Sequence, residues 1–227
     1  MCFNSTSSII AFSFGTFISI LLLLKKEYFY SLFSFSIVII QLIEYFAHKS
    51  IDNNNKSLNI LSSKLIYIII FLQPIIFTLG LIYFPPSNIE FKFKNRLSNF
   101  IILGIIYLIM FLLLWFYNEK NNGFKITYIN KCDNICRLNW SMLLTNMLYS
   151  LPFVILYFCL FINFNFITKN NNLYILNNFT TLILFASILY TIFVDKAKTF
   201  NTIYSVFPSL WCFLAVFYGL IILIFKK

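Results

Sequence analysis

Three polar residues, Gln41, Glu44 and His48, lie within or at the end of one long apolar segment. Their spacings of three and four residues place them on one face of a helix. A carboxylate beside an imidazole could hold or pass a proton, and the carboxylate could also bind a cation. The alternative is that Gln41 and Glu44 form hydrogen bonds between helices, with Glu44 protonated. His48, at the end of the segment, could alternatively be an ordinary residue of the membrane interface.

Glu44 is the only acidic residue well inside any of the apolar segments. Placing an ionised carboxylate at the centre of a bilayer costs at least ~2.5 kcal/mol. We therefore expect Glu44 to face the interior of the protein, to pair with another group, or to stay protonated. If the protein moves a proton or a cation, this carboxylate is where we expect the moving ion to bind.

Prolines inside apolar segments are a second group of candidates. Gln73 and Pro74 are adjacent in one segment, and Pro152 and Pro208 lie in two later ones. Because proline has no backbone N–H and leaves a carbonyl free one turn earlier, each of them predicts a helix kink. Beside an amide such as that of Gln73, a kink could line a polar cavity. The alternative is an ordinary kink whose free carbonyl is satisfied by a neighbouring helix.

Cys132 and Cys136 stand four residues apart in the longest polar connector, and Cys2 lies near the N-terminus. We expect a disulfide between Cys132 and Cys136, or between one of them and Cys2, on the oxidising side of the membrane. Free thiols are the alternative. A metal site would need two more ligands, and the chain has no other nearby Cys or His pair and a single His. We therefore expect no metal and no cofactor.

The composition indicates a membrane protein. Of the 227 residues, 60% are hydrophobic and 11% are charged, whereas a soluble domain carries about 25% charged residues. The net charge of +10 comes from Lys residues that flank the apolar segments, where anionic lipid headgroups attract them. No clustered basic face for nucleic acid is present. The expected partners are the lipid bilayer and a small solute or ion, and the sequence is compatible with a homo-oligomer.

Seven apolar segments are long enough, or nearly so, for a bilayer core that requires about 20 helical residues. Because backbone groups in lipid must be hydrogen-bonded internally, and because these segments are apolar on all sides, they predict helices rather than a barrel. The predicted fold is all-α, a bundle of seven transmembrane helices in one domain over residues 1–227. The predicted spans are 7–24, 28–47, 65–84, 100–117, 141–162, 179–194 and 203–225, and polar connectors are predicted at 49–64, 85–99 and 118–140.

The first span sets the predicted orientation. No Lys or Arg precedes it, and Lys25 and Lys26 follow it directly. Positive residues favour the cytoplasmic side, so we expect the N-terminus outside and the C-terminus in the cytoplasm. The later connectors carry nearly equal positive charge on the two sides and do not decide the matter. Trp115 and Trp140 lie at the edges of segments, where indole side chains anchor to the membrane interface.

Short motifs along the whole chain resemble an uncharacterised family of seven-span membrane proteins found in giant DNA viruses and some bacteria. In order, the motifs are Met1–Cys2–Phe3, Gln41–Leu–Ile–Glu44, Gln73–Pro74, Cys132 to Cys136–Arg–Leu–Asn–Trp140, and Pro208–Ser–Leu–Trp211–Cys212. Family members begin with Met-Cys-Trp, whereas Phe3 replaces the Trp here. The resemblance implies the seven-span fold and a membrane location, and it implies no activity. It marks the residues in these motifs as positions to test.

These features are compatible with three functions. The best supported is a small transporter- or channel-like protein with Glu44 as the site for a proton or cation. The second is a structural or assembly protein of a membrane, such as the inner membrane of a virion, because a single carboxylate within the spans is little for a pump. The third is an intramembrane enzyme acting on lipid, with Glu44 and His48 as acid and base. The chain has no nucleophile motif or metal-ligand set, which makes the enzyme the least supported of the three.

Overall fold

The computed structural model describes residues 4–84, 97–128, 138–140, 189 and 216–225. The predicted spans 141–162 and 179–194 lie outside these residues except for Leu189, and only residues 216–225 of the predicted span 203–225 are described. Also outside the described residues are Pro152, Pro208, Cys2, Cys132 and Cys136.

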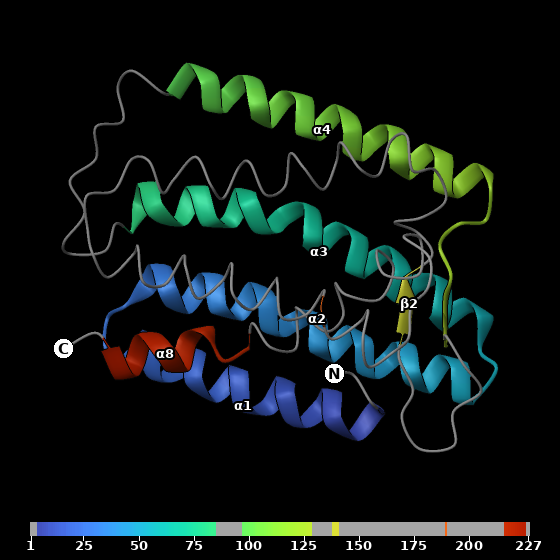
Figure 1. Cartoon of the computed structure of the whole chain (residues 1–227), viewed down its shortest axis with the longest axis horizontal. Coiled ribbons are helices and arrows are strands. Elements are labelled where there is room, and N and C mark those ends of the chain that lie inside the picture. Colours follow the sequence, from blue (N-terminus) through green and yellow to red (C-terminus); the bar gives the residue numbers. More distant parts are fainter. Residues whose placement is uncertain (1–3, 85–96, 129–137, 141–188, 190–215, 226–227) are drawn as a thin grey trace.

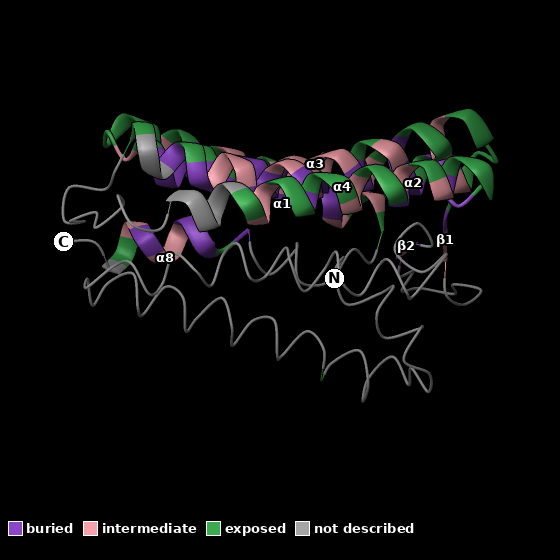
Figure 2. Ribbon diagram, turned by 90° about the horizontal axis from the view of Figure 1, so that it is seen from above, coloured by how far each residue is buried: buried purple, intermediate pink, exposed green. Residues whose placement is uncertain are grey.

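Four long helices dominate the described part of the chain. They are α1 (Ser5–Leu24), α2 (Tyr28–Asp52), α3 (Lys56–Tyr83) and α4 (Leu97–Lys120). Each contains a stretch long and apolar enough to cross a membrane. They lie side by side in chain order (Figure 1), and the short helix α8 (Tyr218–Phe225) covers one face of this layer (Figure 2). The prediction of a mostly helical chain is therefore confirmed, and four of the predicted spans have a helix long and apolar enough to cross a membrane.

Most residues of the polar connector predicted at 49–64 are helical. Helix α2 continues to Asp52 and α3 begins at Lys56, so only residues 53–55 lie between them. The Asn55 side chain accepts a hydrogen bond from Leu58 N at 3.0 Å and caps the start of α3. Asn54 adopts a left-handed backbone conformation, with φ of 52°, which asparagine tolerates better than most residues. Polar residues thus extend both helices beyond their apolar parts.

The all-α prediction is wrong in one detail, because the connector predicted at 118–140 contains two short strands. Strand β1 (Ile126–Tyr128) pairs antiparallel with β2 (Leu138–Trp140), and Ile126 lies opposite Trp140. Side chains of a strand alternate between two faces, so Ile126, Tyr128, Leu138 and Trp140 share one face of the hairpin. Trp140 is fully buried, so the expectation that it anchors to the membrane interface is wrong.

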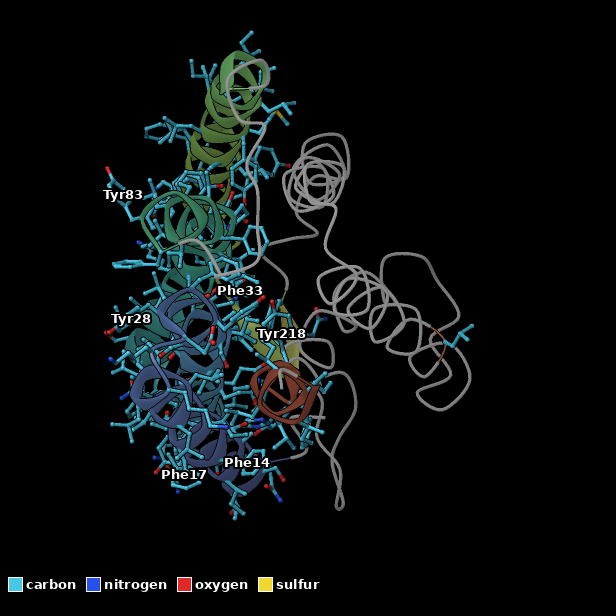
Figure 3. The ribbon with its side chains drawn as sticks, turned by 90° about the vertical axis from the view of Figure 1, so that its left-hand side faces the viewer. Phe14, Phe17, Tyr28, Phe33, Tyr83 and Tyr218 are labelled. Carbon is cyan, nitrogen blue, oxygen red and sulfur yellow. The ribbon has the colours of Figure 1, made fainter. Side chains whose placement is uncertain are left out.

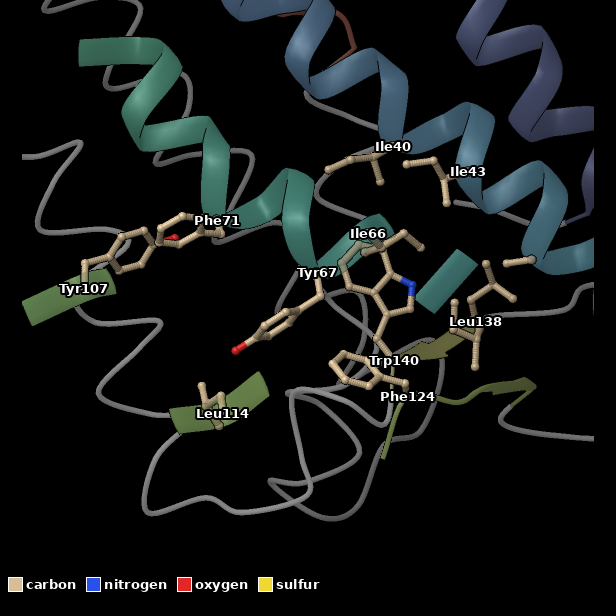
Figure 4. Packing of buried hydrophobic residues seen from close by; sticks show 12 residues of the cluster. Ile40, Ile43, Ile66, Tyr67, Phe71, Tyr107, Leu114, Phe124, Leu138 and Trp140 are labelled. Atoms are coloured by element: carbon tan, nitrogen blue, oxygen red, sulfur yellow. The ribbon is translucent and has the colours of Figure 1, made fainter. Parts of the chain in front are cut away.

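Two apolar clusters hold the layer together, and α2 belongs to both. The first cluster joins α2, α3, α4 and the hairpin (Figure 4); its largest members include Tyr67, Tyr107 and Trp140. The second joins α1, α2 and α8, where Phe33 faces Tyr218 with ring centroids 5.4 Å apart (Figure 3). Within its most apolar stretch, 67% of α2 is buried, against 33% of α1 and 17% of α4. Polar residues on α2 are therefore enclosed by protein on two sides.

Pro74 lies inside α3, and the helix continues on both sides of it. Proline cannot donate a backbone hydrogen bond to the carbonyl four residues earlier, which here belongs to Ile70. The Tyr107 hydroxyl of α4 donates to that carbonyl at 3.4 Å. The Thr78 hydroxyl donates to the Pro74 carbonyl at 2.7 Å. A neighbouring helix therefore satisfies the carbonyl that Pro74 leaves free.

Two glycines allow α1, α2 and α8 to approach closely. A Cβ atom added to Gly15 would clash with Val38 of α2 and would lie 2.8 Å from Val216 Cγ1. A Cβ atom added to Gly219 of α8 would lie 2.7 Å from Ile18 Cγ2 of α1. Because Val216 meets Gly15 and Gly219 meets Ile18, α8 runs parallel to α1. The last described residues therefore lie at the end of the layer opposite to Asn4 (Figure 1).

Candidate functional site

Gln41 and Glu44 form a hydrogen-bonded pair inside α2. Both side chains have no exposed surface, and Gln41 Nε2 donates to Glu44 Oε2 at 2.8 Å. The spacing of three residues places them on neighbouring turns of the same helix. The bond lies within α2, so it does not itself tie α2 to another helix. The Glu44 carboxyl group therefore lies in the protein interior with an amide donor beside it.

Helix α2 is long enough to cross a bilayer, with Glu44 in its interior. At a rise of 1.5 Å per residue, its 25 residues extend over about 37 Å, which exceeds a hydrocarbon core of ~30 Å. Asp52 is the last residue of the helix. His48 lies about 6 Å before it along the helix axis and Glu44 about 12 Å before it. The three titratable groups follow one another at intervals of four residues on one face of the helix.

His48 is fully buried and is linked to Asp52 through Tyr128 of the hairpin. Its Nδ1 lies 3.0 Å from the Tyr128 hydroxyl, and that hydroxyl donates to Asp52 Oδ1 at 3.0 Å. A phenol has one hydrogen, and Tyr128 gives it to Asp52. The Tyr128 oxygen must then accept from His48 Nδ1–H, so neutral His48 has its lone pair on Nε2. In the described part of the structure, Nε2 is buried and has no hydrogen-bond partner.

The surroundings of Tyr128 favour its protonated form. Burial is the largest factor that raises the pKa of its hydroxyl, and the hydrogen bond to Asp52 and the charge of Asp52 raise it further. A neutral phenol next to a carboxylate keeps its hydrogen and continues to donate it. Tyr128 therefore connects Asp52 to His48 throughout the physiological pH range.

Asn59, near the start of α3, holds the hairpin in this position. Its Nδ2 donates to the Ile126 carbonyl at 2.9 Å and to Ser50 Oγ at 3.1 Å. Its Oδ1 accepts from the Ile126 N–H at 3.0 Å. The side-chain amide thus pairs with the backbone of β1 as a neighbouring strand would. Because Tyr128 follows Ile126 by two residues, its side chain points to the same face of β1 and reaches His48.

Gln73, the fourth residue of the predicted site, connects two helices. It is buried, and its Nε2 donates to the Ser36 carbonyl of α2 at 3.3 Å. The structure thus joins Gln41 to Glu44, His48 to Tyr128 and Asp52, and Gln73 to the backbone of α2. Among the described residues, no three His, Cys, Asp or Glu side chains gather as metal ligands.

Asp52, Asn59 and Tyr128 are absent from the site predicted from the sequence. Asp52 could have been included from the sequence, since it lies four residues after His48 and continues the same helical face. Asn59 and Tyr128 join the site only because the hairpin docks on α2 and α3. No protein-family model matches the chain, and no curated protein or solved structure is significantly similar to it. The function is therefore inferred from the chemistry of these side chains.

Proposed function

We propose that the protein is a small transporter- or channel-like membrane protein that moves a proton or a cation, with Glu44 as its intramembrane site. The observation that supports this most is the burial of the Glu44 carboxyl group in α2, one turn from His48. His48 in turn is linked through Tyr128 to Asp52 at the helix end. Polar groups thus follow α2 from its end at Asp52 to Glu44, about 12 Å along the helix axis.

A buried carboxyl group in a membrane helix needs a physical reason to persist. Replacing it by an apolar residue would remove a cost of at least ~2.5 kcal/mol. One reason is helix packing. The other reason is that the carboxyl group exchanges a proton or binds a cation during function. The chain of titratable groups from Glu44 to Asp52 favours this second reason.

The proposal includes a bundle of seven helices with the N-terminus outside and the C-terminus in the cytoplasm. The parallel course of α1 and α8 supports an odd number of crossings, because the chain then begins and ends on opposite sides. In this orientation the hairpin, Tyr128 and Asp52 face the outside. The resemblance to the seven-span family of giant DNA viruses and some bacteria is part of the same proposal.

Ion flux in proteoliposomes tests the proposal. Purified wild type, Glu44→Gln and Glu119→Gln would be reconstituted at equal density, and flux of protons, Na⁺ and K⁺ would be measured under imposed gradients. Glu119, on α4, pairs with Lys64 of α3 and is partly exposed, so it is a matched carboxylate outside the site. We expect Glu44→Gln to fold and to lose flux, whereas Glu119→Gln retains it. Unchanged flux in well-folded Glu44→Gln would refute the role of Glu44.

A structural or assembly role is the second candidate. It is supported by polar contacts that tie helices together, namely Gln73 to the Ser36 carbonyl and Tyr107 to the Ile70 carbonyl. Such contacts stabilise helix pairs in membranes by about 1 kcal/mol each. This candidate predicts no flux of any of the three ions from a folded protein, so the same experiment separates the two functions.

A further inference from the structure

We propose that the moving ion is the proton, and that Tyr128 and Asp52 relay it between His48 and the water outside the membrane. This inference rests on the proposed function and names its substrate and its route. The observation behind it is a continuous pair of hydrogen bonds, from His48 Nδ1 to the Tyr128 hydroxyl and from that hydroxyl to Asp52 Oδ1, each 3.0 Å long.

The orientation of these bonds allows each group to give one proton and receive one. A protonated Glu44 gives its proton to the lone pair of His48 Nε2, which lies one helical turn away at a Cβ separation of about 5–6 Å. Over that distance one water molecule can carry the proton. His48 Nδ1–H then passes its proton to the Tyr128 oxygen, and Tyr128 passes its original hydrogen to Asp52. Asp52 releases a proton to water, and Glu44 is left as a carboxylate. The relay is ready for the next proton once the Tyr128 hydroxyl has turned back to Asp52 and His48 has returned to its Nδ1–H tautomer.

The groups along this route suit a proton better than a metal cation. Na⁺, K⁺ and Ca²⁺ bind to several converging oxygen atoms. Along the route, an amide N–H of Gln41 occupies one oxygen of Glu44, and His48 contributes a ring nitrogen. Within the described ranges, no acidic cluster gathers around Glu44 that would complete the shell of a metal ion. Carboxyl, imidazole and phenol groups at hydrogen-bonding distance are the usual components of a proton relay.

In the described part of the chain, two lysines near the route contact other side chains. Lys49 of α2 lies over the Tyr45 ring, 5.9 Å from its centroid. Lys64 of α3 pairs with Glu119 of α4. Asp52 is thus the charged group that Tyr128 contacts directly. It is the last residue of α2 and so lies where the helix meets the polar side of the membrane.

The test compares Tyr128→Phe with Tyr83→Phe in proteoliposomes. Phenylalanine keeps the ring of Tyr128 and removes only the hydroxyl that carries the proton. Tyr83 lies at the end of α3 and is 72% exposed, so Tyr83→Phe is a matched control. Proton flux would be followed with an internal pH-sensitive dye under a pH gradient, with a potassium ionophore to cancel the membrane potential. Na⁺ and K⁺ flux would be measured in the same vesicles, and thermal stability would establish that each variant is folded.

We expect Tyr128→Phe to lower proton flux at least tenfold, and Tyr83→Phe to leave it unchanged. We also expect proton flux in the wild type to fall when D₂O replaces H₂O, because the moving ion is a proton, and we expect this effect to be smaller in Tyr128→Phe. Unchanged proton flux in folded Tyr128→Phe would overturn the relay. Na⁺ or K⁺ flux that needs Glu44 but not Tyr128 would overturn the relay while leaving the proposed function intact. Absence of every flux would overturn both.

Discussion

Asn59 contributes three hydrogen bonds to the docking of the hairpin on α2 and α3. Its amide forms both a donor and an acceptor bond with the Ile126 backbone, at 2.9 and 3.0 Å, and a third bond with Ser50 at 3.1 Å. Ile126 is only 1% exposed, so water cannot readily replace these bonds. Asn59→Ala therefore leaves a buried backbone N–H and a buried carbonyl without partners.

The expected loss of stability follows from these two groups. An unsatisfied buried polar group costs about 1–3 kcal/mol, so two of them cost about 2–6 kcal/mol. For a protein of this size, 1 kcal/mol changes Tm by roughly 2–4 °C, which corresponds to a decrease of at least about 4 °C. In Asn59→Ala, a hairpin that is no longer held by Asn59 also moves Tyr128 out of hydrogen-bonding distance of His48. We therefore expect proton flux to fall along with stability.

Thermal unfolding in detergent measures this effect, with tryptophan fluorescence as the signal because Trp140 of the hairpin is buried. Asn121→Ala is the control, since Asn121 is exposed and its side chain donates to Tyr117 O within its own helical turn. Asn59→Asp should give an intermediate Tm, because it keeps the acceptor for the Ile126 N–H and loses both donor bonds. If Asn59→Ala and Asn121→Ala unfold at the same temperature, Asn59 does not hold the hairpin and this reasoning is wrong.

Two further predictions concern packing and pH. Gly15→Ala should unfold about 2–12 °C below Gly104→Ala, because overpacking against Val38 and Val216 costs ~1–3 kcal/mol. A Cβ atom at Gly104 meets nothing within 4 Å, so Gly104→Ala is the control. Equal Tm values for the two variants would contradict the close approach of α1 and α2. Because the pKa of Tyr128 is raised by burial and by Asp52, the folded state holds this proton more tightly than the unfolded state. Wild type should therefore lose stability relative to Tyr128→Phe as the pH rises above ~10 and show a constant difference below it, as Tm measurements from pH 8 to 11 would reveal.

The long helices could be predicted from the sequence because the bilayer leaves little choice. A continuous apolar run must satisfy its own backbone hydrogen bonds, and α1, α2, α3 and α4 each contain one. Their ends could not be predicted from hydropathy. Residues 49–64 are polar, yet most of them are helical because Asn55 caps α3 three residues after α2 ends. The Asn55 side chain, rather than hydropathy, marks where α3 begins.

The strands could not be predicted, because each has only three residues. A strand of that length shows no usable alternation of apolar and polar residues. For the same reason Trp140 resembles an interfacial residue in the sequence, although the hairpin buries it against α3. For the site, helical spacing was enough to group Gln41, Glu44 and His48, and the same spacing continues to Asp52. Tyr128 lies 80 residues after His48 in the chain, and only tertiary contacts bring the two together.

The side chains on the buried face of the hairpin fall into two groups, one that packs in the apolar cluster and one residue, Tyr128, that forms polar contacts. Ile126, Leu138 and Trp140 are almost fully buried and would suffice to cover the first apolar cluster. Tyr128 is on the same face but is only partly buried, and its hydroxyl contacts both His48 and Asp52. A phenol placed only for packing would not need to bond two titratable groups of another helix. The apolar side chains of the hairpin thus pack in the first apolar cluster, and Tyr128 joins the hairpin to His48 and Asp52 of α2.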